Sequence, residues 1–227
     1  KKVTITEEIV LPKGFKASGV AVGLKKGNKR DMALLASDVP ATMAGTFTTN
    51  QVKASTVKLC QKRLSGRTGR AVIINSGNAN ACNGPQGMLD AERMAELTAS
   101  LIGADEKHVY VCSTGRIGVQ LPMDLIEKGI PKAAEKLAKD GGFAAAEAIM
   151  TTDTKMKICT ARITVDDKPV VLTAMCKGAG MIEPNMATML AFIMTDAAVD
   201  ADALQSCPSE AVSRSFNRCT VAADRST

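Results

Sequence analysis

The residue with the clearest potential for covalent chemistry is Thr188. It lies between a loop with two glycines and one proline, residues 178–184, and an apolar segment, residues 189–194, and the small residue Ala187 precedes it. A threonine hydroxyl is a poor nucleophile until a base removes its proton, and a threonine that begins a chain can use its own α-amine as that base. The ordinary pKa of this amine, about 8, suits catalysis near neutral pH. The pattern supports a nucleophile released by cleavage of the chain; the alternative is a threonine at a strand edge.

Two further segments carry groups suited to acyl chemistry. Thr114 and Gly115 follow a predicted strand, and a hydroxyl with a backbone N–H at such a position can stabilise the oxyanion of a tetrahedral intermediate. Lys177 can bind a substrate carboxylate, although a single lysine is more often solvated. The glycine-rich loops match neither G-x-x-x-x-G-K-[ST] nor G-x-G-x-x-G. These residues therefore favour acyl chemistry on small carboxylates over phosphate binding.

The histidine and cysteine content argues against other kinds of site. His108 is the single histidine, so a Ser-His-Asp or Cys-His site would have to use it; the alternative is an exposed loop histidine. The seven cysteines include no C-x-x-C pair, and the closest two, Cys207 and Cys219, are 12 positions apart. Zinc sites usually use closely spaced ligands, and an odd count favours buried, reduced thiols over disulfides. We expect neither a metal ion nor a bound cofactor.

Composition and charge exclude several classes of partner. The chain of 227 residues has a net charge of +6 and 45% hydrophobic residues, but only 3% aromatic residues and no tryptophan. Binding of single-stranded nucleic acid needs aromatic stacking surfaces, so no nucleic-acid partner is expected. No apolar stretch approaches the roughly 18 residues of a transmembrane helix, and the first residues become acidic too early for a secretory signal. We expect a cytoplasmic protein without membrane contact.

The elements that must position the candidate residues are predicted from hydrophobic periodicity. Strands are predicted at residues 3–11, 17–24, 32–37, 44–49, 71–75, 109–112, 158–165, 169–175 and 188–194. Helices are predicted at residues 53–64, 85–102, 123–128, 131–139, 143–150 and 200–218, with Asp200 or Asp202 as the last helix's cap. Two hairpins are expected, across residues 25–30 and 166–168. Because strands come in antiparallel pairs with helices between them, the fold class is mixed α/β, α+β-like, in layers.

Four segments resemble one known family in the same order. Residues 177–190, K-G-A-G-M-I-E-P-N-M-A-T-M-L, closely resemble the self-cleavage motif of the bifunctional ornithine acetyltransferase (glutamate N-acetyltransferase) family of arginine biosynthesis. The other three are N-S-G-N-A-N-A at 75–81, C-S-T-G-R-I-G at 112–118 and I-M-T-T-D-T at 149–154. Taken by its residue types alone, the first of these three is a flexible polar turn. The resemblance spans most of the chain.

The resemblance implies a role for each matching residue. Thr188 would be the nucleophile, freed by autocleavage between Ala187 and Thr188. Thr114 and Gly115 would form the oxyanion hole, and Thr152, Lys177 and Thr188 would contact substrate. The reaction would be a ping-pong transfer of acetyl from N2-acetylornithine through an acetyl-threonine to glutamate, and some members also accept acetyl-CoA. The implied fold is a layered, self-cleaving sandwich resembling N-terminal-nucleophile hydrolases.

The resemblance also implies how the chain is divided. Residues 1–187 would be the N-terminal (alpha) fragment and residues 188–227 the start of the C-terminal (beta) fragment, which is expected to be truncated because family members are longer. The fragments would associate as an alpha2beta2 heterotetramer. Residues 222–223 are Ala-Ala where the family has Asp-Gly. Two other functions stay open: a related N-terminal-nucleophile amidase or aminopeptidase, and an inactive, truncated precursor.

Overall fold

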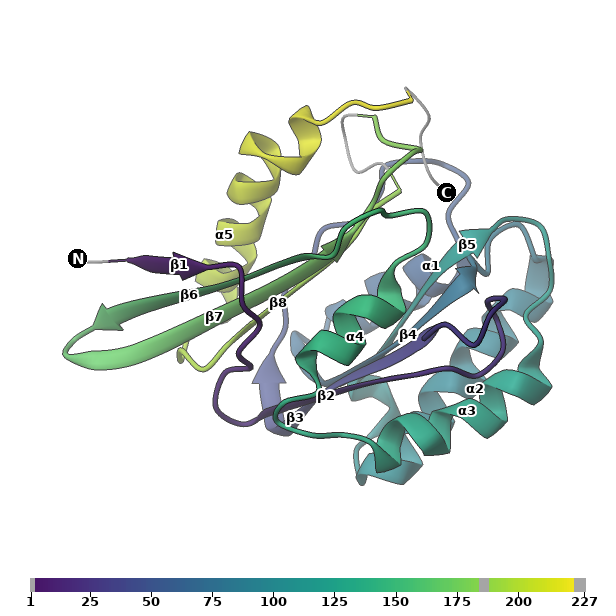
Figure 1. Ribbon diagram of the computed structural model, residues 1–227, viewed down its shortest axis with the longest axis horizontal. Coiled ribbons are helices and arrows are strands. Elements are labelled where there is room, and N and C mark those ends of the chain that lie inside the picture. Colours follow the sequence, from purple (N-terminus) through teal and green to yellow (C-terminus); the bar gives the residue numbers. More distant parts are fainter. Residues whose placement is uncertain (1–2, 184–187, 223–227) are drawn as a thin grey trace.

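Two four-stranded sheets form the centre of the molecule (Figure 1). The computed structural model describes residues 3–183 and 188–222. One sheet has the order β2 (Phe15–Val20), β3 (Met32–Thr42), β4 (Thr68–Asn78), β5 (Val109–Arg116); the other has β1 (Thr4–Thr6), β6 (Lys157–Val165), β7 (Lys168–Lys177), β8 (Leu190–Thr195). The helices are α1 (Ser55–Leu64), α2 (Gly84–Ile102), α3 (Met123–Glu135), α4 (Gly142–Ile149) and α5 (Ala201–Arg214), with short 3-10 helices at Glu106–His108 and Phe216–Arg218.

The core has two halves, one on each face of the β2–β5 sheet. Alternate residues of β3 point to opposite faces, so that Met32 and Leu34 pack with α1, α2 and α3, whereas Ala33 and Leu35 pack with α4 and the second sheet. Figure 1 shows α2 and α3 on one side of the molecule and β6, β7 and β8 on the other. This layered arrangement of helices and sheets confirms the predicted fold class. None of the helices within the described ranges combines the length and apolar character needed to cross a bilayer.

The pairing of β4 with β5 differs from the prediction of antiparallel pairs, because these two strands are parallel. Parallel neighbours need a long crossover connection, and α2 supplies it. As a result the carboxyl ends of β4 and β5 lie side by side, with Ser76 opposite Thr114 and Gly77 opposite Gly115. Both strands also continue beyond their predicted ends, through residues 76–78 and 113–116.

Three other predicted elements need correction. The first strand is restricted to Thr4–Thr6, and residues 44–49 form no strand because the backbone of Gly45 pairs with the side-chain amide of Gln205 instead. The two helices predicted around residue 129 are one helix, α3, which runs through Pro131. Burial of Ile130 and Ala133, on either side of Pro131, keeps the helix continuous despite the lost hydrogen bond. The two predicted hairpins and the Asp200 cap are confirmed.

A buried carboxylate replaces the predicted strand at residues 21–24. Asp31 is fully buried, and its two oxygens accept hydrogen bonds from the N–H groups of Val22, Gly23, Leu24 and Lys25 at 2.7–3.1 Å. Four donors on one carboxylate wrap this segment around Asp31 and prevent it from extending β2. The carbonyl oxygen of Leu24 thereby comes within 3.0 Å of where a Cβ on Gly77 would lie.

Replacing Asp31 with asparagine is expected to destabilise the protein by about 3 kcal/mol, because an NH2 group would face donors that need an acceptor. The measurement is the free energy of unfolding from a urea titration. Asp38 provides the matched control: it is an exposed aspartate that pairs with Lys16, so D38N should leave the urea midpoint almost unchanged. Equal midpoints for the two variants would contradict the structural role given to Asp31.

Candidate active site

The ends of three strands converge at one end of the molecule, and they carry three of the residues predicted from the sequence. Thr114 and Gly115 lie near the end of β5, beside the end of β4. Lys177 is the last residue of β7 in the other sheet. Its Nζ donates a hydrogen bond to Thr114 Oγ1 at 3.1 Å, so the candidate site includes a polar contact between the two sheets.

The Lys177–Thr114 hydrogen bond leaves the threonine hydroxyl available as a donor. A lysine ammonium has donors only, so the oxygen of Thr114 must accept, and its own hydrogen can point elsewhere. Both side chains are buried, with 3% of Lys177 and 5% of Thr114 exposed. An oriented O–H group beside a buried cation is the kind of donor that stabilises a developing oxyanion.

The protonation of Lys177 depends on burial and on two charged neighbours. Burial lowers the pKa of Lys177 below its ordinary value, the charge of Asp153 opposes this effect, and the charge of Lys157 adds to it. For Asp153, burial alone would raise the pKa, but hydrogen bonds from Lys157 and from the amides of Gly178 and Thr151 hold that pKa below its ordinary value. Asp153 is therefore a stable negative charge within electrostatic range of Lys177.

Gly115 is held where no other residue fits. Its φ is +136°, and a Cβ there would lie 2.4 Å from the carbonyl carbon of Gly77 and 2.5 Å from the amide nitrogen of Asn78. The ends of β4 and β5 approach this closely only because residue 115 has no side chain. The backbone of Gly115 is thus fixed directly beside Thr114.

Thr188 lies next to this end of β7. It precedes β8, which pairs with β7 up to Leu190 opposite Lys177, and its carbonyl oxygen is 3.4 Å from where a Cβ on Gly178 would lie. Within residues 3–183 and 188–222, the buried Oγ1 of Thr188 has no hydrogen-bond partner. A buried hydroxyl without a partner needs an explanation, and one explanation is that the hydroxyl takes part in a reaction. Ala187, the other residue of the predicted cleavage site, lies outside the described residues.

Of the remaining sequence candidates, Thr152 adjoins the residue that bonds to the N–H of Gly178, whereas His108 lies far from Thr114 and Lys177. Thr152 is exposed in the turn that follows α4, directly before Asp153. His108 ends a 3-10 helix at the start of β5, six positions before Thr114 and so about 20 Å along the strand from it. Among the described residues, no group of three or more His, Cys, Asp or Glu side chains is placed to hold a metal ion. The absence of a metal or cofactor in the functional protein stays a prediction.

The cysteines follow the sequence prediction only in part. All seven are free thiols, and Cys60 is buried. Cys82, Cys207 and Cys219, in contrast, are exposed. The last two lie within or after α5, a helix in which no residue is buried, so the prediction of buried thiols is wrong for this region.

The prediction that N-S-G-N-A-N-A forms a flexible turn is also wrong. Asn75, Asn78 and Asn80 are all buried. Asn75 Nδ2 donates to the carbonyl of Asn78 at 2.9 Å, and Asn75 Oδ1 accepts from Ser113 Oγ at 2.6 Å. A paired polar network inside the protein fixes the groups that it joins. This segment therefore braces β5 one residue before Thr114.

Reasoning from the sequence missed Asp153, which neighbours the candidate site. It lies in the fourth matching segment, T-T-D-T, but carried no predicted role. A single carboxylate between threonines is typical of a turn, and only the structure shows that its side chain is fully buried and bonded to the N–H of Gly178 at 2.9 Å.

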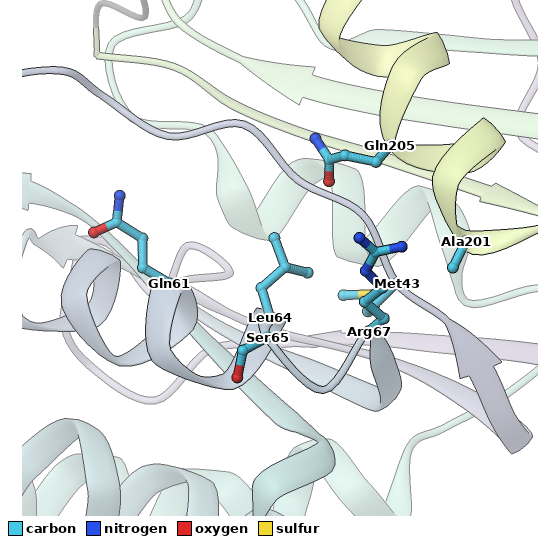
Figure 2. Close-up of a pocket in the computed structure, with 7 residues that line it drawn as sticks. All are labelled: Met43, Gln61, Leu64, Ser65, Arg67, Ala201 and Gln205. Atoms are coloured by element: carbon cyan, nitrogen blue, oxygen red, sulfur yellow. The ribbon is translucent and has the colours of Figure 1, made fainter.

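A pocket lies at the opposite end of β4 from Thr114 and Lys177 (Figure 2). Its volume is about 270 Å³, and its lining comes from α1, α5 and the segments beside them: Met43, Gln61, Leu64, Ser65, Arg67, Ala201 and Gln205. Figure 2 shows Gln205 and Ala201 of α5 facing the end of α1 across it. Arg67, which lines it, directly precedes the first residue of β4, whereas the candidate site lies at the last residues of that strand. The pocket is therefore separate from the candidate site.

Comparison with known proteins gives consistent matches. The ArgJ family model matches residues 16–227. The arginine biosynthesis bifunctional protein ArgJ of Caldanaerobacter subterraneus subsp. tengcongensis is 48% identical over 220 residues, which are 97% of this chain and 54% of that protein. The chain thus spans about half the length of the curated relatives it matches.

Solved structures agree with these sequence matches. The arginine biosynthesis bifunctional protein ArgJ of Bacillus halodurans matches with a TM-score of 0.76 and 37% identity, over 82% of this chain and 100% of that chain. The ornithine acetyltransferase of Mycobacterium tuberculosis, solved with ornithine, matches with a TM-score of 0.76 and 39% identity, over 81% of this chain and 98% of that chain.

A more distant match bears on the fold alone. An L-aminopeptidase D-Ala-esterase/amidase of Ochrobactrum anthropi, described as a variant of the Ntn hydrolase fold, matches with a TM-score of 0.51 and 11% identity, over 91% of this chain and 69% of that chain. This likeness confirms that the layered α/β fold resembles N-terminal-nucleophile hydrolases. Because the family model covers residues 16–227 and the sequence likeness extends over nearly the whole chain, this chain belongs to the ArgJ family.

Proposed function

We propose that this chain carries the nucleophile, the oxyanion site and a carboxylate-binding lysine of an acetyltransferase that moves acetyl from N2-acetylornithine to glutamate. The observation that carries the proposal is the hydrogen bond between Lys177 and Thr114 at the end of β7. Thr188 lies beside the same strand end, and its buried hydroxyl has no hydrogen-bond partner among the residues that the structure describes. The printed names of the relatives, arginine biosynthesis proteins and an ornithine acetyltransferase solved with ornithine, support this substrate class.

In the first half-reaction, Thr188 Oγ attacks the acetyl carbonyl carbon of N2-acetylornithine, and the α-amine of Thr188 takes the hydroxyl proton. The oxyanion accepts hydrogen bonds from the Thr114 hydroxyl and the Gly115 N–H. The C–N bond then breaks, and the protonated α-amine returns its proton to the departing nitrogen. Ornithine leaves, and the acetyl group stays on Thr188 as an ester.

In the second half-reaction, the neutral amine of glutamate attacks the acetyl carbon of this ester. The same donors hold the second oxyanion, and the α-amine of Thr188 takes the proton that the attacking nitrogen loses. The C–O bond then breaks, and the α-amine passes this proton to the departing Thr188 Oγ. Both substrates carry a carboxylate, which the buried ammonium of Lys177 can bind. Thr152 is an additional substrate contact in this proposal, because its exposed turn adjoins Asp153 and the β7 end. Acetyl-CoA is an alternative acetyl donor, used as a substrate rather than a bound cofactor.

Cleavage between Ala187 and Thr188 is part of the proposal, because it creates the α-amine that acts as the base. Two observations support it. The solved Bacillus halodurans chain is matched along its whole length by 82% of these 227 residues, or about 186 residues, close to the size of the 1–187 fragment. In this structure β8 of the second fragment pairs with β7 of the first along Leu172–Lys177. Cleaved fragments would therefore stay joined in one sheet, as the proposed alpha2beta2 assembly in the cytoplasm requires.

Transfer of a labelled acetyl group tests the proposed function. The whole protein is incubated with N2-acetylornithine labelled in its acetyl group, with and without glutamate. We expect the label on Thr188 when glutamate is absent and in N-acetylglutamate when it is present. Labelled acetate without N-acetylglutamate would instead indicate an N-terminal-nucleophile amidase, and an uncut, unlabelled chain would indicate an inactive precursor.

Replacing Thr114 with valine is expected to lower kcat by about 100-fold to 1,000-fold, because valine keeps the shape but removes the proposed oxyanion donor. Steady-state kinetics on the cleaved protein measure this loss. Thr98→Val is the matched control, since Thr98 is equally buried but bonds within α2, near the start of β5. A T114V protein with the kcat of T98V would remove Thr114 from the oxyanion site.

A further inference from the structure

The carboxylate of Asp153 holds together three segments of the chain. Asp153 lies between α4 and β6, and its side chain is fully buried. One oxygen accepts hydrogen bonds from Lys157 Nζ at 2.6 Å and from the N–H of Gly178 at 2.9 Å, and the other accepts from the N–H of Thr151 at 3.1 Å. The carboxylate thus connects its own turn, strand β6 and the segment that follows β7.

The bond to Gly178 is placed where the β7–β8 ladder ends. The last pair of that ladder is Lys177 with Leu190. Beyond it, the N–H of Gly178 bonds to Asp153, and the other side of Gly178 faces the carbonyl oxygen of Thr188. One side chain therefore fixes the backbone that directly follows Lys177 and lies near the carbonyl oxygen of Thr188.

Asp153 also interacts electrostatically, as a negative charge, with several titratable groups around it. These are Lys157 on β6, Cys176 and Lys177 on β7, and Lys25 between β2 and β3. Lys157 and Lys177 repel each other, because each is a cation near the same buried carboxylate. Without Asp153, a buried Lys177 would lose the charge that favours its protonated form.

We propose that Asp153 is a positioning residue of this site, which holds the Lys177–Gly178 backbone against the Thr188 segment and so places Lys177 for a substrate carboxylate. The inference deepens the proposed acetyl transfer and rests on it. Asp153 itself touches no reacting atom in this scheme. It acts through the amide of Gly178 and through the charge of Lys177.

The test compares D153N with K157M in the whole protein. Asparagine keeps the shape of Asp153 but removes its charge, so Lys177 should lose its proton at lower pH. We expect the KM for N2-acetylornithine to rise about tenfold and the alkaline limb of kcat/KM to move to lower pH. The fragment that begins at residue 188 should also form about tenfold more slowly, because the Gly178 backbone is less well fixed.

K157M is the matched control, because it removes a charge from the same ion pair without touching the Gly178 bond. Lys157 lowers the pKa of Lys177, so its loss should move the alkaline limb to higher pH, opposite to D153N. Lys157 is also half exposed, and K157M leaves the Gly178 N–H with its acceptor on Asp153, so cleavage should proceed near the wild-type rate.

The outcomes separate this inference from the proposed function. If D153N keeps the wild-type KM, alkaline limb and cleavage rate, or only lowers the thermal midpoint, Asp153 has a structural role and the inference is overturned. Shifts of the limb in the same direction for D153N and K157M would overturn it as well. Failure of the proposed function would appear in the wild-type protein itself, as an absence of N-acetylglutamate.

Discussion

Replacing Thr188 with alanine in the whole protein is expected to abolish both the fragment that begins at residue 188 and the transfer of acetyl to glutamate. Both steps in our proposal use the same oxygen, first on the peptide bond before it and then on the acetyl carbonyl. Loss of a covalent nucleophile typically lowers kcat by about ten-thousand-fold or more. The measurements are intact mass under denaturing conditions, which shows cleavage and bound acetyl, and the rate of N-acetylglutamate formation.

Two matched variants make the result specific. Thr188→Ser keeps a hydroxyl at the same position, so cleavage and transfer should continue at a reduced rate. Thr195→Ala removes another threonine of the same segment, whose hydroxyl accepts a hydrogen bond from the N–H of Ala197, and this variant should cleave normally. If T188A still accumulates an acetyl group on the protein, the nucleophile is another residue and the proposed site is wrong.

The location of the candidate site could be predicted from the sequence because its residues lie at the ends of predicted elements. Thr114 and Gly115 follow a run of buried residues in β5, and Lys177 ends an alternating strand, so both positions were predictable within a few residues. Sequence separation gave no indication that Lys177 and Thr114 touch, since they are 63 positions apart. That contact depends on the packing of two sheets, which hydrophobic periodicity does not specify.

The polar residues around the site were the hardest to interpret from composition. Asparagines and glycines are typical of turns, and Asn75 and Asn78 lie in a segment with that composition. In the fold they are buried at the end of β4, because parallel pairing with β5 extends the strand and gives their side chains partners. Asp31 and Asp153 are similar cases: each carboxylate is explained by backbone N–H groups that only the folded chain brings to it.

Replacing Gly115 with alanine is expected to cost about 3 kcal/mol of stability or more, because the new Cβ would overlap backbone atoms rather than a mobile side chain. The nearest atoms would be the carbonyl carbon of Gly77 at 2.4 Å and the amide nitrogen of Asn78 at 2.5 Å, and the φ of +136° is itself unfavourable for alanine. The midpoint of urea unfolding measures this cost. Any folded G115A protein must separate the ends of β4 and β5, so we also expect kcat to fall by about 100-fold as Thr114 moves.

Gly118→Ala separates the steric effect from the backbone effect. Gly118 also has a positive φ, +75°, but no heavy atom lies within 4 Å of where its Cβ would be. This control should cost only about 1 kcal/mol, the price of the left-handed conformation, and should keep its kcat. Equal losses in the two variants would mean that the close approach of β4 to β5 is not what holds residue 115.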